Sequence, residues 1–233
     1  TYTLFPNSLD EEVVLRTFIN KENSDYPDLV VVVSEPNTLN RGIVIYQQVR
    51  ESGLPAIFVV NMEDELEDKG IKIDYPKLEK YLQTKVLTTD ARNGKGIDTL
   101  IENFELQVPP YFGALELPSE FSPALEEAKK IFPLETEYKT WLHLAQEEAV
   151  GLSDDSIAQL KAIRTKYNIT TQQLQKEEAI LRHKNINKEF ENFVQKSENK
   201  KLSNTEKIDN ILLHPVFGYI IFFGILFFIF LFF

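Results

Sequence analysis

Two polar residues stand out for the chemistry that their position could support. Asn61 and Asp64 open and close the run Asn-Met-Glu-Asp, directly after an apolar run that predicts a buried strand. In open α/β sheets, ligands bind beyond the carboxyl ends of the strands. An aspartate there can accept two hydrogen bonds from the N1 and N2 donors of guanine, and adenine has no such donor pair. Asp64 is therefore a candidate for guanine selection, although the spacing alone also fits a solvated loop acid.

A second candidate segment follows another short apolar run and reads Thr-Asp-Ala-Arg-Asn-Gly-Lys-Gly over residues 89–96. It resembles the Ser-Ala-Lys/Arg loop of GTPases, in which the alanine N–H faces the guanine O6. That resemblance gives this role to Ala91, between Asp90 and Arg92, and the glycines permit a tight turn. Alone, the segment also fits an ordinary Asn-Gly turn. The order of strand, N-x-x-D, strand and A-R-x-G-x-G is more specific and predicts a guanine-nucleotide fold.

The elements that must position these residues are predicted from continuous apolar runs rich in Val and Ile. Such runs are typical of parallel strands covered by helices on both faces. The predicted strands span 28–34, 55–61 and 85–89, and segments able to form helices span 39–52, 75–83 and 97–107. Residues 1–111 therefore read as the later half of a doubly wound α/β domain.

The next part of the chain, residues 112–202, is predicted to be a small all-α helical domain. Pro109-Pro110 precedes it, apolar residues recur at helical spacing, and Trp141 is expected in its core. Ser122 before Pro123 is expected to cap one helix, and Thr170 with Gln173 fits a capping box for another.

Residues 203–233 are expected to lead into a membrane. A capping-box spacing at residues 203–206 precedes an uncharged run, 216–233, that would extend about 27 Å as a helix. Lys196, Lys200, Lys201 and Lys207 lie before that run, so the positive-inside rule places residues 1–213 in the cytoplasm. We interpret the run as a truncated transmembrane helix.

Composition excludes several classes of function. Subtracting 36 acidic from 25 basic residues leaves a net charge of −11, which disfavours nucleic acid as a ligand. The absence of cysteine excludes disulfides and thiolate sites, and three scattered histidines predict no metal site. No G-x-x-x-x-G-K-S/T motif is present to hold phosphates and magnesium, so no catalytic residues are assigned and the chain alone is expected to be inactive.

Several segments together resemble the FeoB family of ferrous iron transport proteins. Residues 1–12 are similar to the stretch that follows the D-x-P-G motif of that family's second switch, and residues 61–64 to its base motif. Residues 69–74 and 206–219 are also similar, and the likeness covers nearly the whole chain. The acidic residues 10–12 would then belong to a switch segment, although a solvated helix start fits them equally well.

This resemblance implies a truncated P-loop GTPase-like parallel sheet domain, a small all-α domain and a first transmembrane helix. It further implies GTP or GDP as ligand, with magnesium in the full-length protein. Ferrous iron would pass through a separate membrane domain of a bacterial inner-membrane transporter, and a homo-oligomer is left open. GTP hydrolysis by the full-length protein would gate or drive iron uptake.

The sequence departs from the pattern of that family in ways that bear on affinity. Met62 cannot stack on a base as a lysine stem does, Asp90 adds a negative charge beside the expected pocket, and residues 35–41 differ from the usual strand end. These differences predict weak nucleotide binding. Two other functions stay open: a membrane-tethered regulatory GTPase without transport, and a structural anchor with a degenerate nucleotide fold.

Overall fold

The computed structural model describes most of the chain in two compact units. The described residues are 3–6, 8–21, 23–105, 111, 115–146, 151–196, 208 and 211–232, without the side chains of Leu9, Asp10, Glu67, Asp68 and Lys196. One unit comprises Thr1–Glu63 and Ile73–Gln195, and the other Asp64–Lys72 and Lys196–Phe233. Several predictions lie outside the described residues, namely those for Pro109-Pro110, residues 203–206, Lys200, Lys201 and Lys207.

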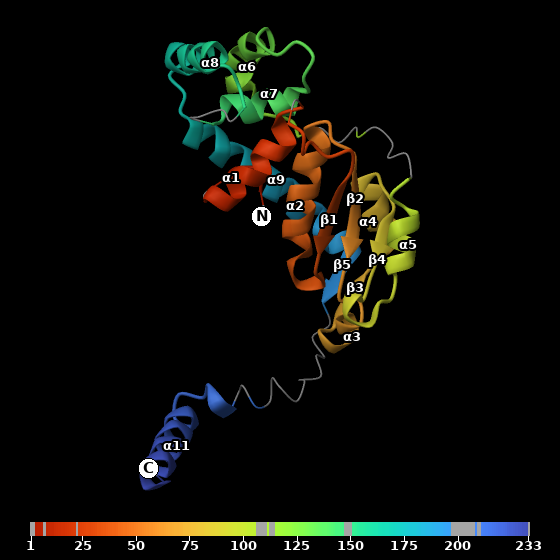
Figure 1. Ribbon diagram of the computed structural model, residues 1–233, viewed down its shortest axis with the longest axis vertical. Coiled ribbons are helices and arrows are strands. Elements are labelled where there is room, and N and C mark those ends of the chain that lie inside the picture. The colour runs from red at the N-terminus through yellow and green to blue at the C-terminus, as the bar shows by residue number, and fades with distance from the viewer. Residues whose placement is uncertain are drawn as a thin grey trace. The chain divides into compact units, whose positions relative to one another are not determined.

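The first unit is built on a parallel three-stranded sheet (Figure 1). Its strands are β1 (Val30–Ser34), β2 (Ala56–Val60) and β4 (Val86–Thr88), in the order β1-β2-β4. Phe58 is the register partner of Val32 on one side and Val86 on the other. The predicted strands and their parallel arrangement are thus confirmed.

Helices cover both faces of this sheet, as continuous apolar strands require. On one face lies α2 (Leu39–Glu51), which packs on β1 and β2 and sets Tyr46 edge-on against Phe58, with ring centroids 5.5 Å apart. On the other face lies α5 (Ile97–Glu102), whose Leu100 packs against a cluster that includes Val59 (Figure 1). These two helices fix the sheet whose strand ends carry the candidate residues.

A second, two-stranded sheet pairs β3 (Ile71–Ile73) with β5 (Val194–Lys196). The strand β5 corrects the prediction that residues 112–202 are all helical. Phe193 and Val194 are buried, and the backbone at Val194 is extended, so burial of this apolar pair ends the preceding helix. Next to β3, Asp74 caps α4 (Tyr75–Leu82) by accepting from the Lys77 N–H, and its own N–H donates to the Phe193 carbonyl.

The remaining helices of this unit are α1 (Leu9–Ile19), α6 (Ser122–Lys129), α7 (Glu137–Leu144), α8 (Asp154–Tyr167) and α9 (Thr171–Phe193). Short 3-10 turns are η1 (Pro36–Thr38), η2 (Ala91–Asn93) and η3 (Ser119–Phe121). The helices α6, α7 and α8 contact one another around the buried Trp141, and α9 packs along α2. Residues 10–12 lie in the first turn of α1.

The two predicted helix caps differ in outcome. The Thr170 hydroxyl accepts from the Gln173 N–H at 3.2 Å, as its spacing predicts. Ser122 is wrong as a cap, because Phe121 occupies the N-cap and Ser122 is already the first helical residue. The preceding turn η3 continues directly into α6, which leaves no extended residue before the helix for a serine cap.

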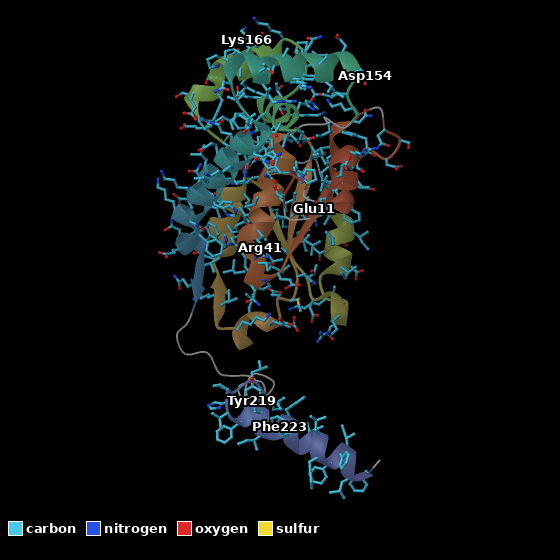
Figure 2. The ribbon with its side chains drawn as sticks, turned by 90° about the vertical axis from the view of Figure 1, so that its left-hand side faces the viewer. Glu11, Arg41, Asp154, Lys166, Tyr219 and Phe223 are labelled. Atoms are coloured by element: carbon cyan, nitrogen blue, oxygen red, sulfur yellow. The ribbon has the colours of Figure 1, made fainter. Side chains whose placement is uncertain are left out.

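The second unit holds α3 (Glu65–Asp68) and α11 (Phe217–Phe232). Helix α11 consists of Phe, Ile, Leu, Gly and Tyr, and side chains such as Tyr219 and Phe223 extend outward from it (Figure 2). Before it, His214 Nδ1 accepts from the N–H groups of Val216 and Phe217. Within the described residues, no helix has both the length and the apolar character needed to cross a bilayer.

Candidate functional site

The candidate site lies where two neighbouring parallel strands end. Residues 61–63 follow β2 and residues 89–96 follow β4, and we call these two segments the base loops. The Thr89 N–H donates to the Val60 carbonyl at 2.9 Å, and the Glu63 N–H donates to the Thr89 carbonyl at 3.3 Å. The strand pairing of β2 with β4 therefore continues into the loops and holds them side by side.

Asn61 joins the base loops through its side chain. Its Oδ1 accepts from the Ala91 N–H at 3.1 Å and from the Thr89 hydroxyl at 3.0 Å. The GTPase-like reading expects the Ala91 N–H to face the O6 of a guanine. In this structure that donor is bonded to Asn61.

Asp90 lies inside its loop, where its carboxylate accepts from the backbone N–H and the side-chain amide of Asn93. Its backbone exchanges two hydrogen bonds of 3.0 Å with Lys95, and its residue surface is 7% exposed. The sequence predicts an added negative charge beside a base pocket. The structure uses that charge to cap η2, which ties the carboxylate to the loop itself.

Gly96 keeps the loop after β4 close to the strand. Its φ is +80°, and a Cβ added there would lie 2.2 Å from the Thr88 carbonyl oxygen. An L-residue would therefore meet both backbone strain and a collision with main chain. This glycine, which begins α5 as its N-cap, is needed for the close approach.

Met62, Arg92 and Asp64, the other residues predicted for the site, take no part in the two hydrogen bonds that Asn61 Oδ1 accepts. Met62 has a φ of +60° and is half-buried, whereas Arg92 is exposed. Asp64 is exposed and opens the second unit, so the geometry of the base loops is described without it. Among the described residues, no group of three His, Asp or Glu side chains is placed to hold a metal ion.

The structure adds contacts that the sequence did not predict. The Thr89 hydroxyl bonds to Asn61, and Lys95 pairs with Glu63 at 3.6 Å across the base loops. A threonine at the end of a predicted strand was the available signal for the first contact. Nearby, burial together with the charge of Glu63 raises the pKa of Tyr75 to about 12.

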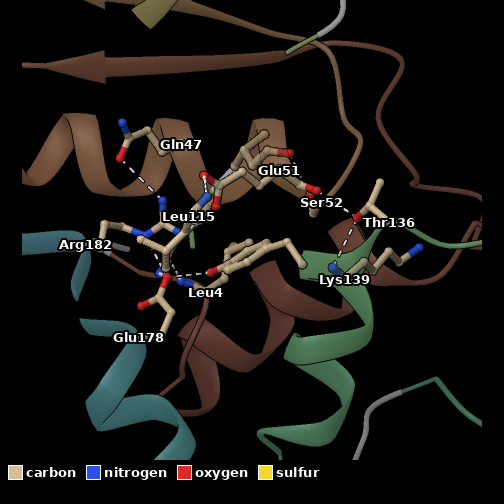
Figure 3. Close-up of polar contacts among 12 residues, drawn as sticks. Leu4, Gln47, Glu51, Ser52, Leu115, Thr136, Lys139, Glu178 and Arg182 are labelled. Atoms are coloured by element: carbon tan, nitrogen blue, oxygen red, sulfur yellow. Dashed lines mark hydrogen bonds and ion pairs between the residues drawn. The ribbon is translucent and has the colours of Figure 1, made fainter. Parts of the chain in front are cut away.

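A second polar centre lies between α2, α7 and α9 (Figure 3), and we call it the buried ion network. Arg182 donates through Nη2 to Glu51 Oε2 and through Nε to Glu178 Oε1, both at 2.6 Å. Glu178 Oε1 also accepts from the Tyr138 hydroxyl at 2.9 Å and from Gln48 Nε2 at 3.2 Å. The network thus joins three helices that are far apart in the sequence.

Arg182 stays charged although it is only 1% exposed. Burial alone would lower the pKa of Arg182, but the facing Tyr138, Glu178 and Glu51 raise the pKa overall. Through Gln48, the network also reaches the start of the chain, because Gln48 Oε1 accepts from the Leu4 N–H at 2.8 Å.

Comparison with known proteins gives a consistent family likeness. The family described as ferrous iron transport protein B matches residues 1–104. A FeoA/FeoB fusion protein of Porphyromonas gingivalis is 38% identical over 109 residues, covering 45% of this chain and 13% of that protein. The Fe(2+) transporter FeoB of Staphylococcus aureus is 26% identical over an alignment of 244 residues, covering 99% of this chain. The chain spans only 36% of that transporter.

Several solved FeoB domains have a similar fold. The cytosolic domain of L. pneumophila FeoB has a TM-score of 0.67 at 23% identity, covering 84% of this chain and 78% of that one. The T. maritima cytosolic domain in a GDP form has a TM-score of 0.61 at 16% identity, covering 84% and 77%. The mGMPPNP-bound S. thermophilus NFeoB has a TM-score of 0.58 at 19% identity, covering 78% and 74%.

Proposed function

We propose that the chain is a member of the FeoB family and the guanine-nucleotide-binding region of a GTP-dependent ferrous iron transporter. The match of residues 1–104 to the family model and the similarity to FeoB proteins over nearly the whole chain support this proposal. The observation that carries this proposal is the Asn61 bridge, which joins the loops at the ends of β2 and β4. That edge of a parallel sheet is where ligands bind in α/β folds. FeoB domains of similar fold have been solved in GDP and GMPPNP forms.

In this proposal, the base loops and Asp64 recognise the guanine. Asp64 would accept from N1 and N2 of the base, and Ala91 would offer its N–H to O6. Asn61 accepts from this N–H in the structure and would share it with O6 or release it. Met62 and Arg92 would flank the base, and Asp90 would support the loop through Asn93. These residues would supply contacts to the base and none to the phosphates.

Phosphate and magnesium binding would come from a phosphate loop in a longer protein, because these 233 residues contain no G-x-x-x-x-G-K-S/T motif. Magnesium would neutralise charge on the phosphates during hydrolysis. We therefore expect no magnesium-dependent GTP turnover from the 233-residue chain alone. In the longer protein, hydrolysis would gate or drive iron uptake.

We propose three functional regions: residues 1–111 as the nucleotide-binding part, residues 112–202 as a helical regulatory part, and residues 203–233 as the approach to an inner membrane. Residues 1–213 would be cytoplasmic. The packing of α9 along α2, with the contact from Leu4 through Gln48 to Glu178, supports a regulatory link between the first two regions.

The test of base recognition is nucleotide binding by the longer protein that carries this sequence. Asp64→Ala should weaken binding of a labelled GDP analogue by about 2 to 4 kcal/mol, from two charge-assisted bonds partly replaced by water. Asp64→Asn should shift preference toward xanthine nucleotides. Asp98→Ala, which removes an exposed acid from α5, is the matched control. Equal affinity of the Asp64 and Asp98 variants would reject the assignment.

Transport is tested separately, by ferrous iron uptake in cells that lack their own transporter. Uptake that depends on both the intact protein and Asp64 supports the proposal. If the intact protein binds guanine nucleotides and raises no uptake, the membrane-tethered regulator takes its place. If the intact protein neither binds guanine nucleotides nor raises uptake, the structural-anchor function replaces the proposal.

A further inference from the structure

A cavity of about 530 Å³ lies away from the base loops, between α2, α9 and residues 3–5. We propose that it is a binding site for a small organic anion with an apolar body, which acts as an effector of the adjoining segment. The proposal stands on this cavity alone and is independent of guanine-nucleotide binding.

Helical spacing places the lining residues on facing surfaces of two helices. On α2, Arg41, Val44 and Gln48 line the cavity and follow one another at steps of three and four residues, which puts them on one side of the helix. On α9, Lys176 and His183 are seven positions apart and so lie two turns from each other on one side. Figure 2 shows Arg41 on α2. The cavity therefore has cationic groups on both of its helical walls.

The charges that line the cavity favour an anion, in contrast to the chain's net charge of −11. Arg41 and Lys176 are exposed and line the cavity from α2 and α9, whereas the buried Arg182, which also lines it, is already paired with Glu51 and Glu178. Glu178 is the one acid among the described lining residues, and its Oε1 already accepts three hydrogen bonds inside the buried ion network. Within the described part of the chain, Lys176 has no carboxylate at salt-bridge distance. Its ammonium group can therefore turn to a ligand.

The inner part of the cavity is apolar and larger than a simple ion. Phe5 and Val44 line it and are 7% and 6% exposed, and Ala179 adds a small side chain from α9. Small-molecule sites are commonly about 300 to 1,000 Å³ and combine apolar walls with a few polar groups. A carboxylate or phosphate group at the rim with an apolar body inside would match both parts.

An occupant would contact the start of the chain as well as the two helices. Thr3 and Phe5 line the cavity, and the Leu4 N–H between them is held by Gln48, which also lines it. A ligand that binds this arrangement better than any other stabilises it. The site would thus control whether residues 3–5 stay docked on α2.

The test is titration of the purified 233-residue chain, in a non-ionic detergent, with phenyl phosphate as the probe. Inorganic phosphate lacks the apolar body, and benzyl alcohol lacks the charge. We expect phenyl phosphate to bind most tightly, with an affinity that falls as salt is raised. No binding at concentrations up to about 10 mM would overturn the proposal. If benzyl alcohol bound as tightly as phenyl phosphate, the requirement for an anion would be overturned. If inorganic phosphate bound as tightly, the requirement for an apolar body would be overturned.

Variants locate the binding. Lys176→Gln should weaken phenyl phosphate binding about fivefold, the size expected for one partly exposed ion pair. Ala179→Leu should abolish it by filling the cavity without changing charge, and circular dichroism would show that this variant is folded. Lys184→Gln makes the same charge change at an exposed position of α9 outside the cavity lining and should leave affinity unchanged. Equal losses of phenyl phosphate affinity in the Lys176 and Lys184 variants would overturn the assignment of binding to this cavity.

Hydrogen exchange gives an independent readout of the effector role. Phenyl phosphate should slow exchange of the Leu4 amide in the wild type and have no effect in Ala179→Leu. Binding without any change at this amide would overturn the effector role.

Discussion

The base loops and the buried ion network both depend on polar contacts, but they differ in burial and in sequence separation. Asn61 and Ala91 are 30 positions apart, and their loops follow neighbouring strands at a half-exposed surface. Gln47 and Arg182 are 135 positions apart, and the network around them is enclosed by three helices. The comparison shows that the loops take their geometry from the sheet, whereas the network takes it from helix packing.

This difference has an energetic consequence. Water can replace the contact between the half-buried Asn61 and the exposed Ala91, so its deletion should remove about the net value of a hydrogen bond. Water has little access to Arg182, Glu51 and Glu178, and deletion of one charge leaves the others buried without compensation. Loss of a side chain should therefore destabilise the network more than the loops.

The largest expected effect is that of Arg182→Ala, which leaves Glu51 and Glu178 buried without their guanidinium. We expect a loss of about 3 to 5 kcal/mol in the free energy of unfolding, measured by urea denaturation. Lys184→Ala, at an exposed position of the same helix, should change it by less than about 0.5 kcal/mol. Similar values for the two variants would show that the network contributes nothing beyond surface charge.

Gly96→Ala is expected to rank second and tests whether backbone, more than side chains, fixes the base loops. Its Cβ would lie 2.2 Å from the Thr88 carbonyl oxygen at a φ of +80°, so we expect a loss of about 2 to 3 kcal/mol. Gly94→Ala is the control, because its φ is +72° and no atom lies within 4 Å of the added Cβ. Strain alone should cost it about 1 kcal/mol. A Gly96 variant no less stable than the Gly94 variant would contradict the close approach.

Asn61→Ala should have a smaller effect on stability, because the N–H of the exposed Ala91 can turn to water and no charge is left buried without its partner. We expect a loss of about 1 kcal/mol by thermal unfolding, within the range for net hydrogen-bond contributions. Thr89→Val removes one of the two hydrogen bonds to Asn61 and should reduce stability by about half as much as Asn61→Ala. If Asn61→Ala reduced stability as much as Arg182→Ala, the contrast between exposed and buried polar centres would fail.

The smallest effect concerns Tyr75, near Glu63 of the base loops. Its pKa of about 12 in the folded protein exceeds the ordinary value of 10, so the folded state keeps a proton that the unfolded chain loses between pH 10 and 12. Its contribution to stability is present below pH 10 and falls as pH rises. With partial exposure, we expect a loss below about 1 kcal/mol at pH 11. Urea unfolding at pH 9 and 11 should show that stability depends less on pH in Tyr75→Phe than in the wild type. The same pH dependence in both proteins would contradict this prediction.

Much of the fold around the base loops could be predicted from the sequence. The three parallel strands and the helices α2, α4 and α5 follow from continuous apolar runs and helical spacing. The placement of Asn61 near Ala91 follows from the rule that parallel strands end at one edge. These features depend on local patterns, which the order of residues displays directly.

Other features were decided only by tertiary packing. The strand β5 forms because Phe193 and Val194 are buried beside β3, and the sequence pattern alone predicted helix there. Asp90 caps its own loop through Asn93, a contact that the sequence pattern did not predict.

Glu51, Glu178 and Arg182 look like ordinary surface charges on amphipathic helices in the sequence. They become a buried network only when α2 and α9 pack together. The sequence by itself determined the strands, most helices and the polar residues at the strand ends, because short-range periodicity encodes them. Only the tertiary structure decided which charges are buried together, because that depends on contacts between segments more than a hundred residues apart.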